Sequence, residues 1–501
     1  MSGSALTKSS PDVLPGVTGN QRLAAAAGAD GAGPQATVGR VFTVGTLRYT
    51  AGGLVVLFIW LLWGDFCSTV FQSIFGSFLP LYLHHLRASN TLIAFLATGV
   101  GGVMNLLFLP NISMWTDRHR GRWGRRIPFL FWSTPVAALA LVGIGYSSEI
   151  GAWLQSTGGP LRAFSVAGLT LAVISVLVVL YTLFLMTTNN VYQFLLRDVV
   201  PQEVMAWFLA LFRVVGVVAG SLFSWYLFRY IVGRPKLLCL GVGLLYVVSF
   251  AVICWGVREG RYPPPPPRPE RGAIFGTVQS YLRYFRECLS VGIYRNYIFV
   301  FVLLITGQTA TAPFMVLFGI KTLRIGVGDY GKILALSTLA SGVVYLPMGY
   351  LCKHFHPMRV TLASVVLTAV GPAAAFFFVW NRAGWLAYSV ATMLPAVGWA
   401  LGSFAVMMML FPAEEFGKFS SSLMAIGWGS LALTSYLVGA FMNFFGGNYR
   451  MVLLVSLVCY AAAIVPMVQV YRGWKRHGGP DNYIPPLPKA MRRSRLPVVG
   501  E

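Results

Sequence analysis

The amino-acid sequence predicts an all-α membrane protein whose twelve transmembrane helices form two pseudo-symmetric six-helix bundles. Three observations support this fold class. The 501-residue chain is 56% hydrophobic and 11% charged, and a water-soluble protein of this size cannot bury so much apolar surface. It contains twelve apolar runs of about 20 residues or more, each long enough to cross a bilayer core of about 30 Å. A polar insert after the sixth run divides the runs six plus six.

The predicted spans follow one another along the chain. In the first half they are Leu54–Leu83, Thr91–Trp115, Ile127–Tyr146, Phe164–Asn189, Val204–Tyr230 and Leu237–Val257. In the second half they are Tyr297–Ile320, Tyr330–Leu351, Val360–Trp380, Leu386–Phe411, Ser420–Phe445 and Met451–Tyr471.

These spans define five regions of the chain. The bundles occupy residues 50–257 and 297–472, and a central loop at 258–296 contains a run of five prolines. Residues 1–49 are rich in small residues, and residues 473–501 mix proline with arginine, so we expect both tails to be disordered. The first long apolar run is itself a span, so no signal peptide is expected.

The positions of the basic residues predict the orientation, because lysine and arginine are retained on the cytoplasmic side of a membrane. Of the 38 lysines and arginines, 27 fall in the tails, the central loop and alternate loops, ten fall in the remaining loops, and one lies inside a span. The sequence therefore predicts a multi-pass protein of the cell membrane with both termini in the cytoplasm.

Other functional classes find little support. The net charge of +23 suggests nucleic-acid binding, but the apolar composition argues against it. The sequence has no GxxxxGK[ST] loop and no HExxH motif, and its six histidines lie in loops or a tail. Its six cysteines are scattered. We expect neither an enzyme nor a bound metal or cofactor.

The stretch "WTDRHRGRWGRR", residues 115–126, holds five arginines, one histidine and one aspartate. It falls in the cytoplasmic loop between spans 2 and 3. One interpretation is a topology signal that also attracts anionic lipid headgroups, at about 1 kcal/mol per basic residue. A second interpretation depends on the order of the residues as well as on their charge.

The longer stretch "TDRHRGRWGRRIPFLF" resembles the loop motif between helices 2 and 3 of the major facilitator superfamily. Within it, the long basic tract is similar to that of the glycoside-pentoside-hexuronide cation symporters and the plant-type sucrose transporters. Weak internal repetition agrees with two related halves, since "VVPQEVMAW" after span 4 corresponds to "LFPAEEFGKF" after span 10. The resemblance implies the major facilitator fold, with a substrate bound near the midplane between the halves.

The same resemblance implies a cytoplasmic gate. In the superfamily the aspartate of this motif holds the inner gate shut together with an arginine and an adjoining helix end, and charge pairs with two discrete arrangements suit a switch. The gate candidates here are Asp117, Arg118, Arg125, Arg126 and Asp198.

Inside the spans the charged residues are few. Asp65 is the only acidic residue well inside a span, and Arg213 is the only basic one. At a helix centre such a residue costs about 2.5–3.5 kcal/mol on insertion scales, so each is expected to face a cavity or a partner. One alternative is a structural Asp65–Arg213 pair that holds helices 1 and 5 together.

The other alternative is proton coupling. Burial disfavours the charged carboxylate whereas a nearby Arg213 favours it, so a conformational change that separates the two would switch the proton on and off. In proton-coupled sugar porters of the superfamily a helix 1 aspartate has this role. Melibiose-type symporters bind their cation on helix 2, where this chain has only Asn105 and no acid. The resemblance therefore favours H⁺ over Na⁺.

Polar and aromatic span residues are candidates for binding a hydroxylated substrate. Asparagine and glutamine offer hydrogen bonds, and tryptophan stacks on a sugar face, although tryptophan in a span is more often packing or an interface anchor. The candidates are Gln72, Asn105, Asn189, Asn190, Gln193, Gln308, Trp63 and Trp399.

Together these features lead us to expect a monomeric secondary active transporter in a lipid bilayer, with a small-molecule substrate and no nucleic-acid partner. The favoured activity is proton-coupled symport of a sugar or glycoside by alternating access. The alternatives are an exporter or facilitator of another small organic solute, such as a folate-like compound, and a membrane sensor that keeps the fold without transport.

Overall fold

The computed structural model describes residues 41–157, 162–260, 262 and 285–486, except for the side chains of residues 109, 110, 114, 418 and 481. Within these ranges, twelve helices are long and apolar enough to cross a membrane. The prediction of an all-α, multi-pass membrane protein with twelve spans is therefore confirmed. The described helices belong to one compact unit that begins at Phe42.

The amino-terminal half contains the first six membrane helices. Their main segments are α1 (Ala51–His85), α3 (Val100–Arg118), α4 (Ile127–Gly145), α6 (Val166–Val199), α7 (Gln202–Leu222) and α9 (Pro235–Gly256). α3 continues from α2 (Asn90–Ala94) and the π-helical turn η1 (Phe95–Gly99), and α7 continues into the π-helical turn η3 (Phe223–Leu227). The short helices α5 (Ser147–Ser156) and α8 (Tyr230–Gly233) lie in the connections.

The carboxyl-terminal half contains the other six membrane helices. The first is built from α11 (Gly292–Ile305), the π-helical turn η4 (Thr306–Ala310), α12 (Ala312–Leu317) and the π-helical turn η5 (Phe318–Thr322). It is followed by α13 (Val327–Phe355), α14 (Pro357–Phe378), α15 (Arg382–Ala391) with α16 (Met393–Leu410), α17 (Phe416–Phe444) and α18 (Met451–Arg476). The 3-10 turn η6 (Ala413–Glu415) precedes α17, and α19 (Gly479–Asn482) follows α18.

Hydroxyl caps and prolines set where several of these helices begin. The side chains of Thr50, Ser89 and Ser165 accept hydrogen bonds from backbone N–H groups in the first turns of α1, α2 and α6, which satisfies donors that have no partner within the helix. α9 and α14 begin at Pro235 and Pro357, where the missing N–H group costs nothing.

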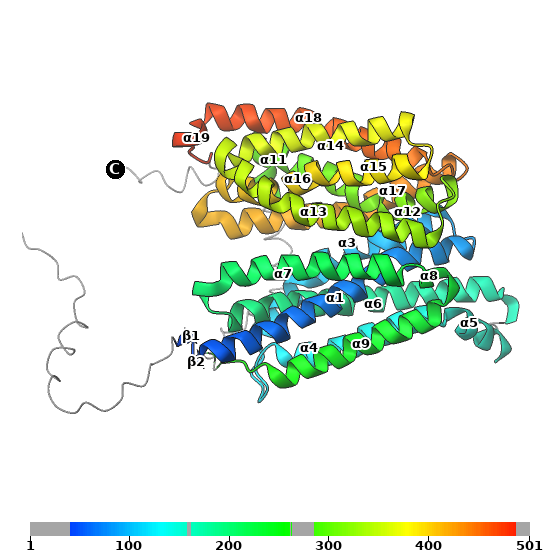
Figure 1. Ribbon diagram of the computed structural model, residues 1–501. Coiled ribbons are helices and arrows are strands. Elements are labelled where there is room, and N and C mark those ends of the chain that lie inside the picture. Colours follow the sequence, from blue (N-terminus) through cyan, green and yellow to red (C-terminus); the bar gives the residue numbers. More distant parts are fainter. Residues whose placement is uncertain (1–40, 158–161, 261, 263–284, 487–501) are drawn as a thin grey trace, which may run out of the picture. The chain divides into compact units, whose positions relative to one another are not determined.

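Each half packs mainly within itself. In the amino-terminal half, α4 lies against α6 and α9, and α1 lies against α7 and α9. In the carboxyl-terminal half, α18 lies against α11 and α14, and α16 lies against α13 and α14. Figure 1 shows the two halves as two groups of helices. α3 and α7 of the amino-terminal half face α17 and α13 of the carboxyl-terminal half.

The halves meet mainly through α3, with α2, against α17 and through α7 against α13, and α1 also contacts α12. Glycines allow the backbones to come close, because a Cβ atom on Gly102 would lie 2.5 Å from the carbonyl oxygen of Trp428, and one on Gly439 would lie 2.5 Å from Cα of Thr91. One hydrophobic cluster runs from the amino-terminal half across this junction to residues such as Phe314.

We call the end of the helices that carries loop 119–126 the basic end, and the opposite one the far end. Polar contacts join the halves at the far end: Asn443 Oδ1 accepts from the backbone N–H of Asn90 at 3.1 Å, and Asn443 Nδ2 donates to Thr91 Oγ1 at 2.8 Å. Tyr449 O–H also donates to Asn90 Oδ1 at 3.1 Å. Toward mid-depth the junction continues with Leu106 against Gly429.

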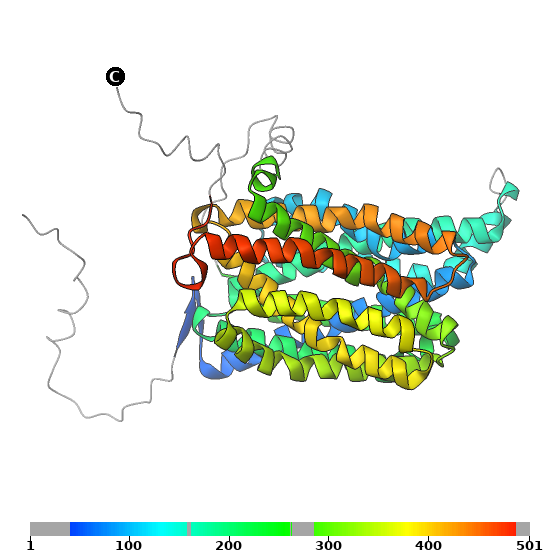
Figure 2. The ribbon, with the colours of Figure 1, turned by 90° about the horizontal axis from the view of Figure 1, so that it is seen from above.

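The structure differs from the sequence prediction at the edges of the membrane region. Parts of both predicted disordered tails are ordered. Strands β1 (Phe42–Val44) and β2 (Leu47–Tyr49) form an antiparallel hairpin, and α18 extends beyond the predicted span to Arg476. Figure 2 shows the hairpin and the end of α18 at the same end of the helices.

The chain after α18 is held by tyrosine hydroxyl groups that donate to backbone carbonyls. Tyr483 O–H donates to Leu410 O at 3.1 Å, and Tyr294 O–H donates to Pro486 O at 2.9 Å. These hydrogen bonds hold Tyr483 and Pro486 in place, within a tail that was predicted to be disordered from its composition alone. The rest of the tails, residues 1–40 and 487–501, and most of the central loop, residues 261 and 263–284, lie outside the described residues.

Candidate functional site

The structure places Asp65 at the contact between α1 and α7. Its side chain is 8% exposed, and among the described residues its Oδ2 atom is buried without a hydrogen-bond partner. Oδ2 lies 3.4 Å from the position of a Cβ atom on Gly216, and Thr69, one turn further along α1, also faces Gly216. The first and fifth membrane helices, α1 and α7, therefore pack against each other at the depth of the Asp65 carboxylate, because Gly216 on α7 leaves room for it.

Arg213 is on the same helix as Gly216, one turn nearer the basic end, and is exposed. The ion pairs within the described part of the chain include none between Arg213 and Asp65. The structure thus places the two residues on helices that pack together, without the direct pair that the structural alternative requires.

One turn beyond Asp65, three polar side chains form a closed ring of hydrogen bonds between α1 and α6. Ser68 Oγ donates to Asn189 Oδ1 at 3.2 Å, Asn189 Nδ2 donates to Gln72 Oε1 at 3.2 Å, and Gln72 Nε2 donates to Ser68 Oγ at 3.1 Å. Gln72 is exposed and Asn189 is half-buried. Ser68 and Gln72 therefore extend the polar face of α1 that Asp65 begins, as their i+3 and i+7 spacing predicts.

The other substrate candidates have more local surroundings. Asn105 and Asn190 each donate to a carbonyl four residues earlier in their own helix, at 2.8 Å. Trp63 donates its indole N–H to Ser249 Oγ on α9 at 3.1 Å. Trp399 is buried in the hydrophobic cluster of the carboxyl-terminal half, and Gln193 is exposed. Trp399 therefore has the surroundings of a packing residue, whereas Trp63 is 44% exposed.

Gln308 has different surroundings, because it lines a cavity of about 360 Å³ inside the carboxyl-terminal half. It lies in the π-helical turn η4, a type of turn that often marks functional sites. The cavity is lined by aromatic and hydroxyl side chains from α13, α15 and α18, among them Tyr330, Trp385, Tyr388, Ser389, Thr392 and Tyr460.

Sequence reasoning missed these aromatic residues. A signal was present, since Trp385, Tyr388, Ser389 and Thr392 follow the i, i+3, i+4, i+7 spacing of one helix face. Because one continuous span was predicted at Leu386–Phe411, the helix face that carries these four residues was not distinguished from the rest of the span. In the structure α15 and α16 are separate helices that meet at Thr392.

At the basic end, Arg126 connects three helices of the amino-terminal half. Its Nη2 atom lies 2.5 Å from Asp117 Oδ1 at the end of α3, and its Nε atom lies 3.3 Å from Asp198 Oδ2 at the end of α6. Its Nη1 atom also donates to Thr116 Oγ1. Arg126 is 4% exposed, so burial strengthens these charge-assisted bonds.

Arg125 completes the cluster. Its Nε and Nη2 atoms donate to both oxygens of Asp198 at 2.8–3.1 Å, a bidentate geometry, and its guanidinium lies 3.9 Å from the ring centroid of Tyr262. Burial disfavours the charged guanidinium, but the hydrogen bonds and charge of Asp198 outweigh burial and raise the pKa of Arg125 above its ordinary value. Asp117, Arg125, Arg126 and Asp198 are thus brought together as predicted from the motif, and Arg118 ends α3 beside them.

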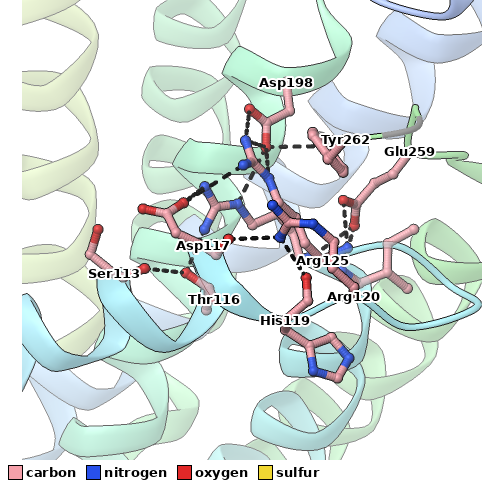
Figure 3. Close-up of polar contacts among 11 residues, drawn as sticks. Ser113, Thr116, Asp117, His119, Arg120, Arg125, Asp198, Glu259 and Tyr262 are labelled. Carbon is pink, nitrogen blue, oxygen red and sulfur yellow. Dashed lines mark hydrogen bonds and ion pairs between the residues drawn. The ribbon is translucent and has the colours of Figure 1, made fainter. Parts of the chain in front are cut away.

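Glu259, at the end of the sixth span, holds the start of α4. Its carboxylate accepts hydrogen bonds from three successive backbone N–H groups, those of Arg125 at 2.9 Å, Arg126 at 2.8 Å and Ile127 at 2.7 Å (Figure 3). A carboxylate in this position satisfies unpaired donors and complements the positive end of the helix dipole. We call this cluster, formed by Asp117, Arg125, Arg126, Asp198, Glu259 and Tyr262, the basic-end network. Its described contacts join residues of the amino-terminal half and the first residues after its last span.

Sequence reasoning missed Glu259 and Tyr262, because both were assigned to the central loop. The available signal was an acid directly after a span, on the same predicted side as the basic loop. Burial, together with the charges of Glu259 and Asp198, raises the pKa of the Tyr262 phenol. Tyr262 therefore stays neutral, and its O–H group lies 3.4 Å from Asp198 Oδ2 as a donor.

No protein-family model and no curated protein matches this sequence. Solved structures do match in fold. The nucleoside transporter NupG superposes with a TM-score of 0.61 at 9% identity, covering 83% of this chain and 100% of that chain. A bacterial homologue of the human lysosomal transporter Spinster, in an inward-facing and occupied conformation, gives 0.59 at 12% identity, covering 86% and 99%.

A D-xylose-proton symporter gives a TM-score of 0.56 at 12% identity, covering 83% of this chain and 97% of that chain. These similar structures are transporters of the major facilitator type with different substrates. The predicted major facilitator fold is therefore confirmed. At these identities the similarity concerns the fold alone.

Proposed function

We propose that this protein is a secondary active transporter that carries a sugar or glycoside together with a proton by alternating access. The observation that carries the proposal is the buried Asp65 carboxylate, whose Oδ2 atom has no hydrogen-bond partner in the described structure. An ionisable group placed so deep in a membrane helix is costly, which favours a functional role. The glycine face of α7 allows its surroundings to change when α7 moves.

The polar ring beside Asp65 supports a hydroxylated substrate. Gln72 and Asn189 carry amide groups that both donate and accept hydrogen bonds. Gln72 lies two turns from Asp65 on the polar face of α1, and Asn189 on α6 is bonded to it. Substrate hydroxyl groups would replace the bonds within this ring. A substrate and a proton bound this close together can be coupled through shared contacts.

The junction between the halves supports alternating access. The polar ties at the far end and the glycine contacts at mid-depth hold the halves together there. With the basic end in the cytoplasm, as the lysine and arginine distribution predicts, closure at the far end is what an inward-facing state requires. The basic-end network links the ends of α3, α4 and α6, and the side chain of Asp117 is 43% exposed. In the proposed cycle Asp117 contacts the other half when that end closes.

The decisive experiment uses purified full-length protein in liposomes, with a panel of labelled sugars and glycosides and an imposed pH gradient. We expect accumulation of at least one sugar that requires the gradient and disappears with a protonophore. Flux without accumulation would indicate a facilitator. Gradient-driven flux of other organic solutes, including folate-like compounds, with none of the sugars would indicate a different substrate class. Absence of flux across the panel would favour a sensor.

A further inference from the structure

A groove of about 900 Å³ lies at the basic end of the amino-terminal half, beside the basic-end network. It is formed by loop 119–126, the first turns of α4, the last turns of α9 and residues 258–260 and 262. Its lining combines arginine side chains with large aromatic ones. Glu259 and Tyr262 in the lining also belong to the basic-end network, whereas Arg122, Trp255 and Arg258 do not.

The groove is on the outer side of the amino-terminal half. α4 and α9, which form its walls, pack against each other and against α1, α5, α6 and α8. Figure 1 shows both helices on the side of this half that is remote from the carboxyl-terminal half. In a protein with twelve membrane spans, this side faces lipid rather than a central substrate path, and the basic end lies at the membrane–water interface.

The aromatic side chains are those expected at such an interface. Trp255 on α9 is 88% exposed and Trp123 in the loop is 60% exposed. Tryptophan is enriched where acyl chains meet headgroups, since its ring is apolar and its N–H group is polar. Phe131 on α4 extends the apolar lining further from the basic end.

The charged side chains give the groove a positive mouth. Arg122 and Arg258 are both exposed and both line it, and neither has an ion pair or side-chain hydrogen bond within the described structure. Arg120 adds a third positive charge, although its Nη1 atom donates to backbone carbonyls of Asp117 and His119. The one carboxylate in the lining, Glu259, already accepts the three N–H groups at the start of α4.

We infer that this groove binds one anionic phospholipid, with the headgroup phosphate at Arg122 and Arg258 and an acyl chain along Trp255 and Phe131. The arginines recognise phosphate oxygens by charge-assisted hydrogen bonds, and the aromatic residues provide an apolar path for a chain. Free phosphate satisfies only the first of these two features. The occupant is therefore a lipid, and it would brace the loop that holds Arg125 and Arg126.

The test is native mass spectrometry of the full-length protein in detergent, titrated separately with phosphatidylglycerol, phosphatidylcholine and inorganic phosphate. We expect one tightly bound phosphatidylglycerol per chain. The double variant Arg122→Gln/Arg258→Gln should weaken this binding about 30-fold, since each basic residue at an anionic surface contributes roughly a factor of five. The matched control, Arg359→Gln/Arg472→Gln, removes two exposed arginines from the carboxyl-terminal half and should bind as the wild type does.

A second measurement does not require removal of charge. In nanodiscs, phosphatidylglycerol brominated on its acyl chains should quench tryptophan fluorescence more strongly than brominated phosphatidylcholine. Most of this difference should vanish in Trp255→Phe. Equal binding of both lipids, equal loss in the control variant, occupancy by inorganic phosphate with the same affinity, or quenching that persists in Trp255→Phe would each overturn the proposal.

Discussion

The carboxyl carbon of Glu259 lies 2.5 Å from the position that a Cβ atom on Gly124 would occupy. Gly124 also has a backbone φ of +100°, which L side chains rarely adopt. Glycine is therefore required at this position for two independent reasons, and both serve to bring the Glu259 carboxylate onto the first turn of α4.

We predict that Gly124→Ala destabilises the amino-terminal half by about 1–3 kcal/mol, because the added methyl group strains the backbone and displaces the Glu259 cap. Thermal unfolding in detergent measures this effect. The matched control is Gly417→Ala in α17, where an added Cβ atom meets nothing within 4 Å. An equal change in melting temperature for the two variants would contradict the proposed requirement.

Asp117→Asn tests the gate. The variant keeps an acceptor for Arg126 but loses the charge, and a hydrogen bond between charged groups contributes about 1.5–3 kcal/mol. We predict normal expression, transport reduced by roughly tenfold or more, and a shift toward the inward-facing form. The shift is measured as faster thiol labelling at Leu106→Cys, a position at the junction between the halves. Labelling at the wild-type rate would argue against a gating role.

Asp65→Asn tests proton coupling. The amide cannot exchange a proton, so we expect uphill accumulation driven by pH to be lost while substrate binding and exchange between equal pools remain. Arg213→Ala should impair both activities. Asp329→Asn is the control, since Asp329 pairs with Arg382 at the far end. If Asp65→Asn still concentrates substrate, the carboxylate is structural and coupling occurs elsewhere.

Asn443→Ala tests the tie at the far end. It removes two hydrogen bonds between the halves, which together stabilise this arrangement by about 1–3 kcal/mol. We predict a larger population open at the far end, seen as longer distances between spin labels placed on the two halves there. Asn448→Ala, which removes a bond within one half, should leave the distances unchanged. A shift in both variants would point to general loosening.

Asn189→Ala tests the polar ring. Its side chain bonds across helices to Ser68 and Gln72, whereas the adjacent Asn190 bonds only to its own helix among its described contacts. We predict that Asn189→Ala raises the transport KM about tenfold, the effect of roughly one lost hydrogen bond, and that Asn190→Ala changes it little. Similar KM values for the two variants would remove the ring from the substrate site.

Much of the basic-end network was predictable, because its members lie in one recognisable motif. Asp117, Arg125 and Arg126 are close in sequence, and Asp198 ends the fourth span on the same predicted side. Glu259 and Tyr262 were not found, since Glu259 bonds to Arg125, 134 residues away, and Tyr262 bonds to Asp198, 64 residues away. No spacing rule connects a residue after one span to the end of another.

The sequence by itself determined the twelve spans, the division into halves and the depth of Asp65 in its helix. Each depends on the hydrophobicity of a segment taken alone, because a membrane selects long apolar helices one at a time. Only the tertiary structure decided that Asp65 faces Gly216 without an ion pair to Arg213, that aromatic residues enclose a cavity near Gln308, and that Tyr483 secures the chain after α18. These features arise where helices distant in sequence pack together, and packing depends on the shapes of both partners at once.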